Sequence, residues 1–166
     1  LQPLEVYEGL SFTLSDNYFK FETSKDQDPL EPMDSDNFEK VNIAELYQKL
    51  AQHGLQYSQD FQGLTECWVS ETKVKSLIKV PYNSLFSSIH PAVIDSAFQS
   101  LSLLETPSEG SFLPFSIDYV KIYKKTKEST FTSFAHLITK TIDSIKANII
   151  LLDSKGDKIV EIKGFV

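Results

Sequence analysis

The feature of the sequence that most constrains its fold is one strongly apolar segment with helical character, residues 91–104. Pro91 suits the first position of a helix, because the missing N–H has no partner there in any case. The apolar residues recur at helical spacing and form two stripes: Val93, Ile94, Ala97, Phe98, Leu101 and Leu104. A helix that is apolar on two sides has to be covered by other elements of the chain.

Segments with strand character surround this helix. Residues 65–71 and 73–80 precede it, and four longer segments follow it: 112–123, 130–139, 145–153 and 158–166. A hairpin turn is predicted at residues 153–157, between the last two. An antiparallel sheet that curls around one apolar helix is a hotdog fold, so we predict an α+β hotdog fold. An up-and-down barrel is the competing architecture, but it has no place for so apolar a helix.

A shorter helix is predicted before this unit. Asn42 suits its N-cap, and Glu45 follows three residues later, as in a capping box. Gly54 is placed to end it. Its apolar face is formed by Leu46, Tyr47, Leu50 and Ala51.

The first part of the chain divides into two further segments. Residues 10–24 have the pattern of a strand, a turn and a second strand. Residues 25–42 are dense in acidic side chains and include Pro29 and Pro32, so we predict a linker there.

Composition excludes several classes of function. The net charge is −7, and all 16 basic residues are lysine, so a nucleic-acid interface, which favours arginine, is not expected. Cys67 is the only cysteine, which excludes an intrachain disulfide and a thiolate metal site. The first ten residues lack the pattern of a signal peptide, and no apolar run approaches the ~20 residues of a membrane span. We therefore expect a cytoplasmic protein with no metal and no membrane partner.

Chemistry is predicted on the apolar helix. Asp95, Gln99 and Ser102 share one face, between apolar residues. A carboxyl group wrapped by a sheet would lose hydration, which raises its pKa, and a neutral carboxylic acid can donate a proton. In the alternative interpretation, Asp95 lies near the first turn and merely stabilises the helix dipole.

Three stretches resemble known motifs of polyketide synthase dehydratases. Residues 90–99, H-P-A-V-I-D-S-A-F-Q, resemble the family's pattern of His-Pro, apolar residues, Asp, and Gln or His four positions later. Residues 46–64 resemble its block Y-x-x-L-x-x-x-G-x-x-Y-G-P-x-F-x-G-L, and residues 113–117 resemble its L-P-F-S strand. The end of the chain, from Asp153, also resembles the end of the family. The match is to the C-terminal half of the domain.

In that family the domain is a double hotdog, so the resemblance implies three parts. Residues 1–24 would be a strand remnant of the N-terminal hotdog, residues 25–42 an acidic linker, and residues 43–166 the C-terminal hotdog. The substrate would be a β-hydroxyacyl chain on the phosphopantetheine of an acyl carrier protein, with no cofactor bound directly. Further partners would be the N-terminal half and the other domains of a homodimeric synthase.

The resemblance also implies roles for particular residues. Asp95 would be the acid that protonates the departing hydroxyl group, with Gln99 as its partner. Tyr57 would form hydrogen bonds near the acid, and Leu113, Pro114 and Phe115 would line the acyl tunnel. His90 is a further candidate at the substrate, although a histidine directly before a helix more often caps it.

The chain departs from the family pattern in two places. The catalytic histidine belongs to a motif H-x-x-x-G-x-x-x-x-P, but His53, His90 and His136 all lack a glycine four residues later. Ser58 and Gln59 replace the family's Gly-Pro. Two alternatives therefore stay open: a double-bond isomerase or cyclase of the same fold, and a non-catalytic dehydratase-like module of the synthase.

Overall fold

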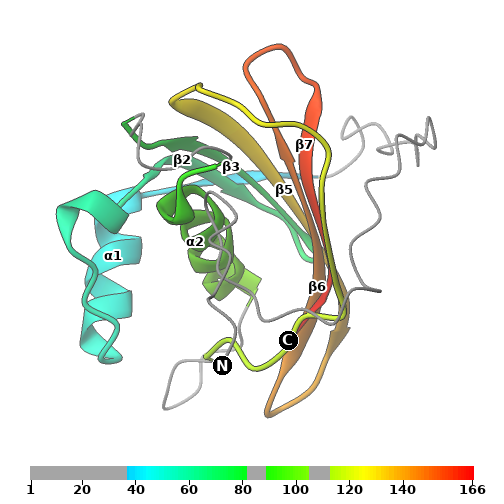
Figure 1. The fold of residues 1–166 in the computed structure, drawn as a ribbon. Helices are drawn as coiled ribbons and strands as arrows, with labels where there is room; N and C mark the ends of the chain where they lie inside the picture. The colour runs from blue at the N-terminus through cyan, green and yellow to red at the C-terminus, as the bar shows by residue number, and fades with distance from the viewer. Residues whose placement is uncertain (1–36, 82–88, 105–112) are drawn as a thin grey trace, which may run out of the picture.

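The computed structural model describes residues 37–81, 89–104 and 113–166, which form one curved antiparallel sheet around a central helix (Figure 1). The chain adopts the predicted hotdog fold. Seven strands pair in the order β1-β2-β3-β5-β6-β7-β4. Their bounds are β1 Glu39–Val41, β2 Leu64–Val69, β3 Lys73–Lys79, β4 Tyr119–Ile122, β5 Thr130–Lys140, β6 Ile145–Leu152 and β7 Lys158–Phe165.

The central helix, α2, spans Pro91–Ser100 and continues as a 3₁₀ turn, η3, over Leu101–Leu104. The predicted helix 91–104 is thus one helical segment that tightens in its last four residues. The inner face of the sheet covers it with alternate residues of each strand, such as Val74 and Ile78 of β3 and Ile149 and Leu151 of β6. Burial of α2 and of this inner face is the main stabilising contribution to the fold.

Helix α1, Ile43–Gln52, lies beside α2 (Figure 1) and has the predicted N-cap. The Asn42 side chain accepts a hydrogen bond from the Ala44 N–H (3.0 Å) and donates one to the Glu45 carboxylate (2.9 Å). Leu46 and Leu50 are buried against the core, but Ala51 is exposed, contrary to the prediction. A ten-residue helix that packs along one side buries a single i, i+4 stripe, and Ala51 lies outside it.

Two predicted segments differ in the structure. Residues 39–41, assigned to the linker, form the edge strand β1 and pair with β2. The predicted strand 112–123 is reduced to β4, Tyr119–Ile122, within the described residues. The preceding residues still follow the chain end, where Phe115 N–H donates to the Val166 carbonyl (2.8 Å). Residues 1–36, 82–88 and 105–112, which include the predicted strands of residues 10–24, lie outside the described residues.

The predicted turn at residues 153–157 is confirmed, and its anchor is Asp153. The Asp153 carboxylate accepts backbone hydrogen bonds from Lys155 (3.0 Å) and Asp157 (2.9 Å). Lys124, in the connection from β4 to β5, forms ion pairs with both Asp153 and Asp157. The turn is thereby attached to the neighbouring connection.

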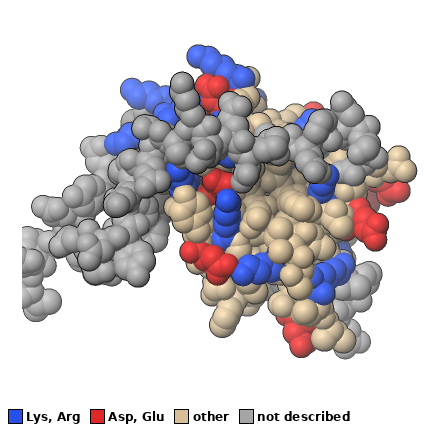
Figure 2. Space-filling model, turned by 90° about the vertical axis from the view of Figure 1, so that its right-hand side faces the viewer, with Lys and Arg blue, Asp and Glu red and all other residues tan. Residues whose placement is uncertain are grey.

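The outer face of the sheet carries lysines next to aromatic rings. Lys40 and Lys75 lie over the Trp68 ring, 5.4 and 5.3 Å from its centroid. On the face to the right of Figure 1, lysines and acidic residues are scattered among other side chains (Figure 2). None of the described helices is long and apolar enough to span a membrane.

Two polar residues, both serines, are buried in the otherwise mainly apolar core. Ser76 of β3 and Ser133 of β5 are directly opposite each other on the inner face and are almost fully buried. Neither hydroxyl group has a hydrogen-bond partner among the residues that the structure describes. A buried hydroxyl group without a partner destabilises the folded state, since it gives up its bonds to water.

Replacing both serines, in the variant Ser76→Ala/Ser133→Ala, should therefore leave the free energy of unfolding unchanged or raise it by up to about 1 kcal/mol per site. Urea unfolding followed by circular dichroism measures the effect. A loss of more than about 1 kcal/mol would contradict the prediction, because it would mean that the two hydroxyl groups are hydrogen-bonded in solution.

Candidate active site on the central helix

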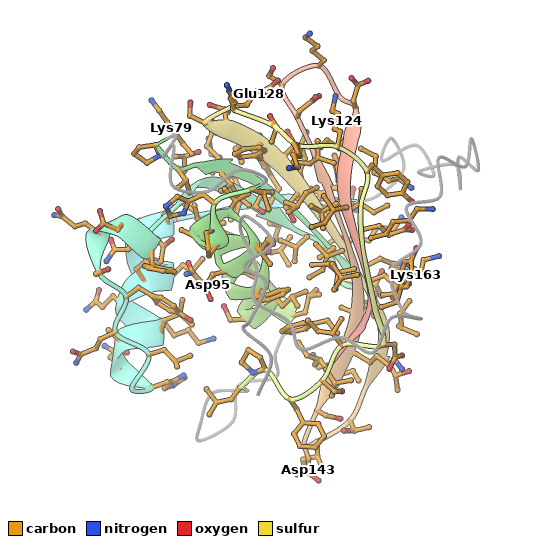
Figure 3. The ribbon with its side chains drawn as sticks, viewed as in Figure 1. Lys79, Asp95, Lys124, Glu128, Asp143 and Lys163 are labelled. Carbon is orange, nitrogen blue, oxygen red and sulfur yellow. The ribbon has the colours of Figure 1, made fainter. Side chains whose placement is uncertain are left out.

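Asp95 projects from the second turn of α2, on the side nearer α1 (Figure 3). Its carboxyl group is half-buried, and this burial raises its pKa, while a hydrogen bond from Gln99 acts in the opposite direction. The first turn of α2 contains no acidic residue, so the alternative interpretation of Asp95 as a dipole-stabilising residue is not supported. The role of Asp95 as an acid stays a prediction.

Gln99 lies one turn after Asp95 and is only 4% exposed. Its Nε2 atom donates to Asp95 Oδ2 (2.6 Å) and to the Phe61 carbonyl oxygen (2.9 Å). Its Oε1 atom accepts a hydrogen bond from the Tyr47 hydroxyl group (3.0 Å). The predicted contact between Gln99 and the carboxyl group is present, and the amide is held from α1 and η2 (Gln59–Phe61) as well.

Tyr47 was assigned to the apolar face of its helix and matches the first tyrosine of the family block, but no role was predicted for its hydroxyl group. Its hydroxyl oxygen also accepts a hydrogen bond from the Leu64 N–H of β2 (3.2 Å). Burial raises the pKa of Tyr47 to about 12, so the group stays protonated at neutral pH. The available signal was the residue type itself, since a tyrosine on a buried face usually has a partner for its hydroxyl group.

Tyr57, predicted to form hydrogen bonds near the acid, lies beside Tyr47. Its ring packs edge-on against Tyr47, with centroids 6.4 Å apart. Burial raises the pKa of Tyr57, and the negative charge of Asp95 raises it further, which shows that the two groups are close enough to interact. The interaction of Tyr57 with a substrate stays a prediction.

His90 caps α2, as the more common interpretation of such a histidine suggested. Its Nδ1 atom accepts a hydrogen bond from the Ala92 N–H (3.1 Å). Burial lowers the pKa of His90, which favours the neutral ring that can accept this bond, although the charge of Asp60 acts in the opposite direction. The structure therefore gives His90 a role in the helix, and its contact with a substrate stays a prediction.

The segment predicted to line an acyl tunnel lies on the surface of the described structure. Leu113 is 66% exposed and Phe115 is 88% exposed, and Pro114 between them is exposed as well. Within the described residues nothing covers these side chains, and their place in an acyl tunnel stays a prediction. Cys67, by contrast, is fully buried, and burial raises its thiol pKa to about 12, as expected for an inert thiol.

Among the described residues, no group of three or more His, Cys, Asp or Glu side chains is placed to hold a metal ion. The chemistry available at the site is that of one carboxyl group with a raised pKa and a fixed amide partner. Such a group can donate a proton to a leaving group that reaches it.

A family model described as the polyketide synthase dehydratase N-terminal domain matches residues 26–166. The chain belongs to this family. Curated relatives include the phthioceranic/hydroxyphthioceranic acid synthase of Mycobacterium tuberculosis, 22% identical over 75% of this chain and 6% of the relative. Another is the probable polyketide synthase 7 of Dictyostelium discoideum, 24% identical over 78% of this chain and 5% of the relative.

Solved structures agree with this family assignment. The dehydratase domain from the CurJ module of curacin polyketide synthase is 29% identical, with a TM-score of 0.71. The match covers 82% of this chain and 51% of that one, so the chain spans about half of the solved dehydratase structure. The dehydratase domain of a mycocerosic acid synthase-like polyketide synthase, at 22% identity and a TM-score of 0.69, shows the same fold.

The raised pKa of Asp95 predicts a specific dependence of stability on pH. A carboxyl group with a raised pKa binds its proton more tightly in the folded state than in the unfolded state. Its contribution to stability is therefore full below pH 3.8, the ordinary pKa of an aspartate, and is lost as the pH rises from there through the pKa of the folded state. The variant Asp95→Asn lacks this titration. Its stability relative to the unmodified chain should rise across that pH range and then stay constant.

Urea unfolding at a series of pH values measures the difference. The matched control is Asp143→Asn, which removes a carboxyl group from the exposed turn between β5 and β6 (Figure 3). Equal pH dependence in the two variants would show that Asp95 is not in a poorly hydrated environment.

Proposed function

We propose that this chain is the acid-bearing, C-terminal half of a polyketide synthase dehydratase. The observation that carries the proposal is the half-buried Asp95 carboxyl group on the central helix, with its pKa raised by burial and one oxygen held by Gln99. A group of this kind supplies a proton to a departing hydroxyl group, which is the acid step of a dehydration.

The assignment to the C-terminal half rests on the sequence motifs. The family model carries the name of the N-terminal domain and matches residues 26–166. The His-Pro-x-x-x-Asp-x-x-x-Gln motif at residues 90–99 is that of the acid-bearing half, and none of the three histidines has a glycine four residues later. A base supplied by another hotdog unit agrees with a chain that spans about half of the solved dehydratases.

Two solved relatives support an acid and a base of these types. One structure of the CurJ dehydratase is of an inactive mutant in which a phenylalanine replaces a histidine. One structure of the CurK dehydratase is of an inactive mutant in which an asparagine replaces an aspartate. We infer that Asp95 has the aspartate role here, and that the histidine is supplied by the N-terminal half.

The proposed substrate is a β-hydroxyacyl thioester on the phosphopantetheine of an acyl carrier protein. The base removes the proton on the α-carbon, the electron pair forms the α,β double bond, and the bond from the β-carbon to the hydroxyl oxygen breaks. Asp95 gives its proton to that oxygen, and water leaves. Since Gln99 donates to Oδ2, the acidic proton is best carried by Oδ1.

The decisive variant is Asp95→Asn in the full synthase, which should abolish water loss and leave the fold intact. Gln99→Ala should slow turnover less, by about 10–100-fold, because it removes a partner and not the proton. Mass spectrometry of acyl chains on the carrier protein measures the loss of water, and Asp143→Asn is the control expected to retain it. Normal dehydration by Asp95→Asn would overturn the proposal.

A non-catalytic module is the second candidate, and the surface position of residues 113–115 favours it, since no tunnel wall is formed by the described residues. The same experiment separates the two. If the unmodified domain removes no water from a β-hydroxyacyl carrier substrate, and a separately supplied histidine-bearing half does not restore the reaction, the module is structural.

The exposed residues also predict how the isolated chain behaves. Leu113, Phe115, Ile117 and Tyr119 alternate along one exposed edge. We expect the chain to associate through this edge when no partner half covers it. Sedimentation velocity should show association that Phe115→Ser weakens and that Ile142→Ser, a change at an equally exposed residue in another turn, does not. A monomer at all concentrations would contradict this prediction.

A further inference from the structure

The hydroxyl group of Tyr47 stands in a chain of hydrogen bonds that ends on the Asp95 carboxyl group. The Leu64 N–H donates to the Tyr47 oxygen (3.2 Å), the Tyr47 hydroxyl donates to Gln99 Oε1 (3.0 Å), and Gln99 Nε2 donates to Asp95 Oδ2 (2.6 Å). The first donor is a backbone group of β2, so its direction is set by the sheet. Because the Tyr47 oxygen already accepts this bond, its own proton points to Gln99.

The orientation of the Gln99 amide is thereby determined from two sides. Its oxygen meets the hydroxyl donor of Tyr47, and its nitrogen meets two acceptors, the Phe61 carbonyl (2.9 Å) and Asp95. An amide rotated by half a turn would place its oxygen against both acceptors. With Asp95 ionised, two repulsive contacts would replace two hydrogen bonds, so the orientation in which Gln99 presents a donor to Asp95 is favoured.

We propose that Tyr47 is a positioning residue for the acid, which acts on Asp95 through Gln99 and does not touch the substrate. The inference deepens the proposed function, since it concerns how the same carboxyl group holds its proton. A donor fixed on Oδ2 favours negative charge on that oxygen and leaves Oδ1 to carry the proton. Loss of the Tyr47 hydroxyl group frees the amide to turn and weakens this donor.

Three of the groups around Asp95, two tyrosines and a cysteine, stay neutral while it titrates. Tyr47 comes from α1, and Tyr57 comes from the connection between α1 and η2. Burial raises the pKa of both tyrosines, so they stay neutral while Asp95 titrates. Cys67 of β2, which interacts with Tyr47, has a thiol pKa raised to about 12 and also stays neutral. His90 is the N-cap residue of α2, and the charged group that acts on its pKa is Asp60.

The test is a carbon-13 NMR titration of the Asp95 carboxyl group in the 166-residue chain. The signal is assigned by its loss in Asp95→Asn. In Tyr47→Phe, the acid dissociation constant of Asp95 should fall about tenfold. The hydrogen bond from Gln99, which lowers the pKa of Asp95, is weaker in this variant, whereas burial still raises that pKa. The control Tyr119→Phe removes a hydroxyl group from the exposed strand β4 and should leave the titration unchanged. An unchanged Asp95 titration in folded Tyr47→Phe would overturn the proposal.

A second measurement needs no variant at Tyr47, in case its loss prevents folding. In the unmodified chain, the side-chain amide signals of Gln99 should shift with pH along the same curve as the Asp95 carboxyl signal. The Tyr47 hydroxyl proton should also exchange slowly enough with water to be observed. Gln99 signals that do not follow Asp95 would overturn the proposal.

Failure of this inference and failure of the proposed function give different results. If Asp95→Asn abolishes water loss but Tyr47→Phe leaves the Asp95 titration unchanged, Asp95 is supported as the acid and the positioning role of Tyr47 is refuted. If the titration shifts but the full synthase removes no water, the positioning role stands and the dehydratase assignment falls. Where both hold, the pH profile of kcat/KM shifts in Tyr47→Phe in the same direction as the titration.

Discussion

The fold depends on the enclosure of one helix by one curved sheet. Helix α2 has fully buried residues around much of its circumference, including Val93, Ser96, Ala97 and Ser100, and the sheet covers it with the inner faces of β3, β5, β6 and β7. A helix with this burial has no stable state outside the sheet, and the sheet has no core without the helix. The two form together or not at all.

The same enclosure gives polar residues on α2 their chemistry. The helix carries two serines that satisfy their hydroxyl groups on its own backbone: Ser96 donates to the Ala92 carbonyl (2.7 Å) and Ser100 to that of Ala97 (2.7 Å). Gln99 is satisfied by groups from α1, η2 and α2 itself. Asp95 differs from these residues, because it keeps one carboxylate oxygen for which the described structure shows no donor. Burial of a polar group destabilises the fold unless the group is hydrogen-bonded. A half-buried carboxyl group with one oxygen that accepts no hydrogen bond from the described residues is therefore a candidate for a role in a reaction.

The sequence was sufficient for the fold because its pattern is set by burial. Alternating residues located β5, β6 and β7 to within about one residue, and the apolar stripes located α2. Strand β1 was missed because three residues in an acidic stretch carry too little pattern to indicate an edge strand. Asp95 and Gln99 were predicted because they are neighbours on one helix. Tyr47 was missed because its partner is 52 residues away, and only the folded chain brings the two together.

The way in which Asp95 is held has a consequence for a dehydratase built from two halves. The described groups that form hydrogen bonds to the carboxyl group or to its amide partner are Tyr47, Phe61 and Gln99, and they all belong to this hotdog unit. The donor on Oδ2 is therefore in place before any other unit contributes. In the proposed reaction, the second half has to bring the base and cover the exposed segment at residues 113–115, and any further burial of Asp95 by that half would raise its pKa again. The hydrogen bond on Oδ2 is thus set by packing within one half, whereas closure of the active site depends on contact between the two halves.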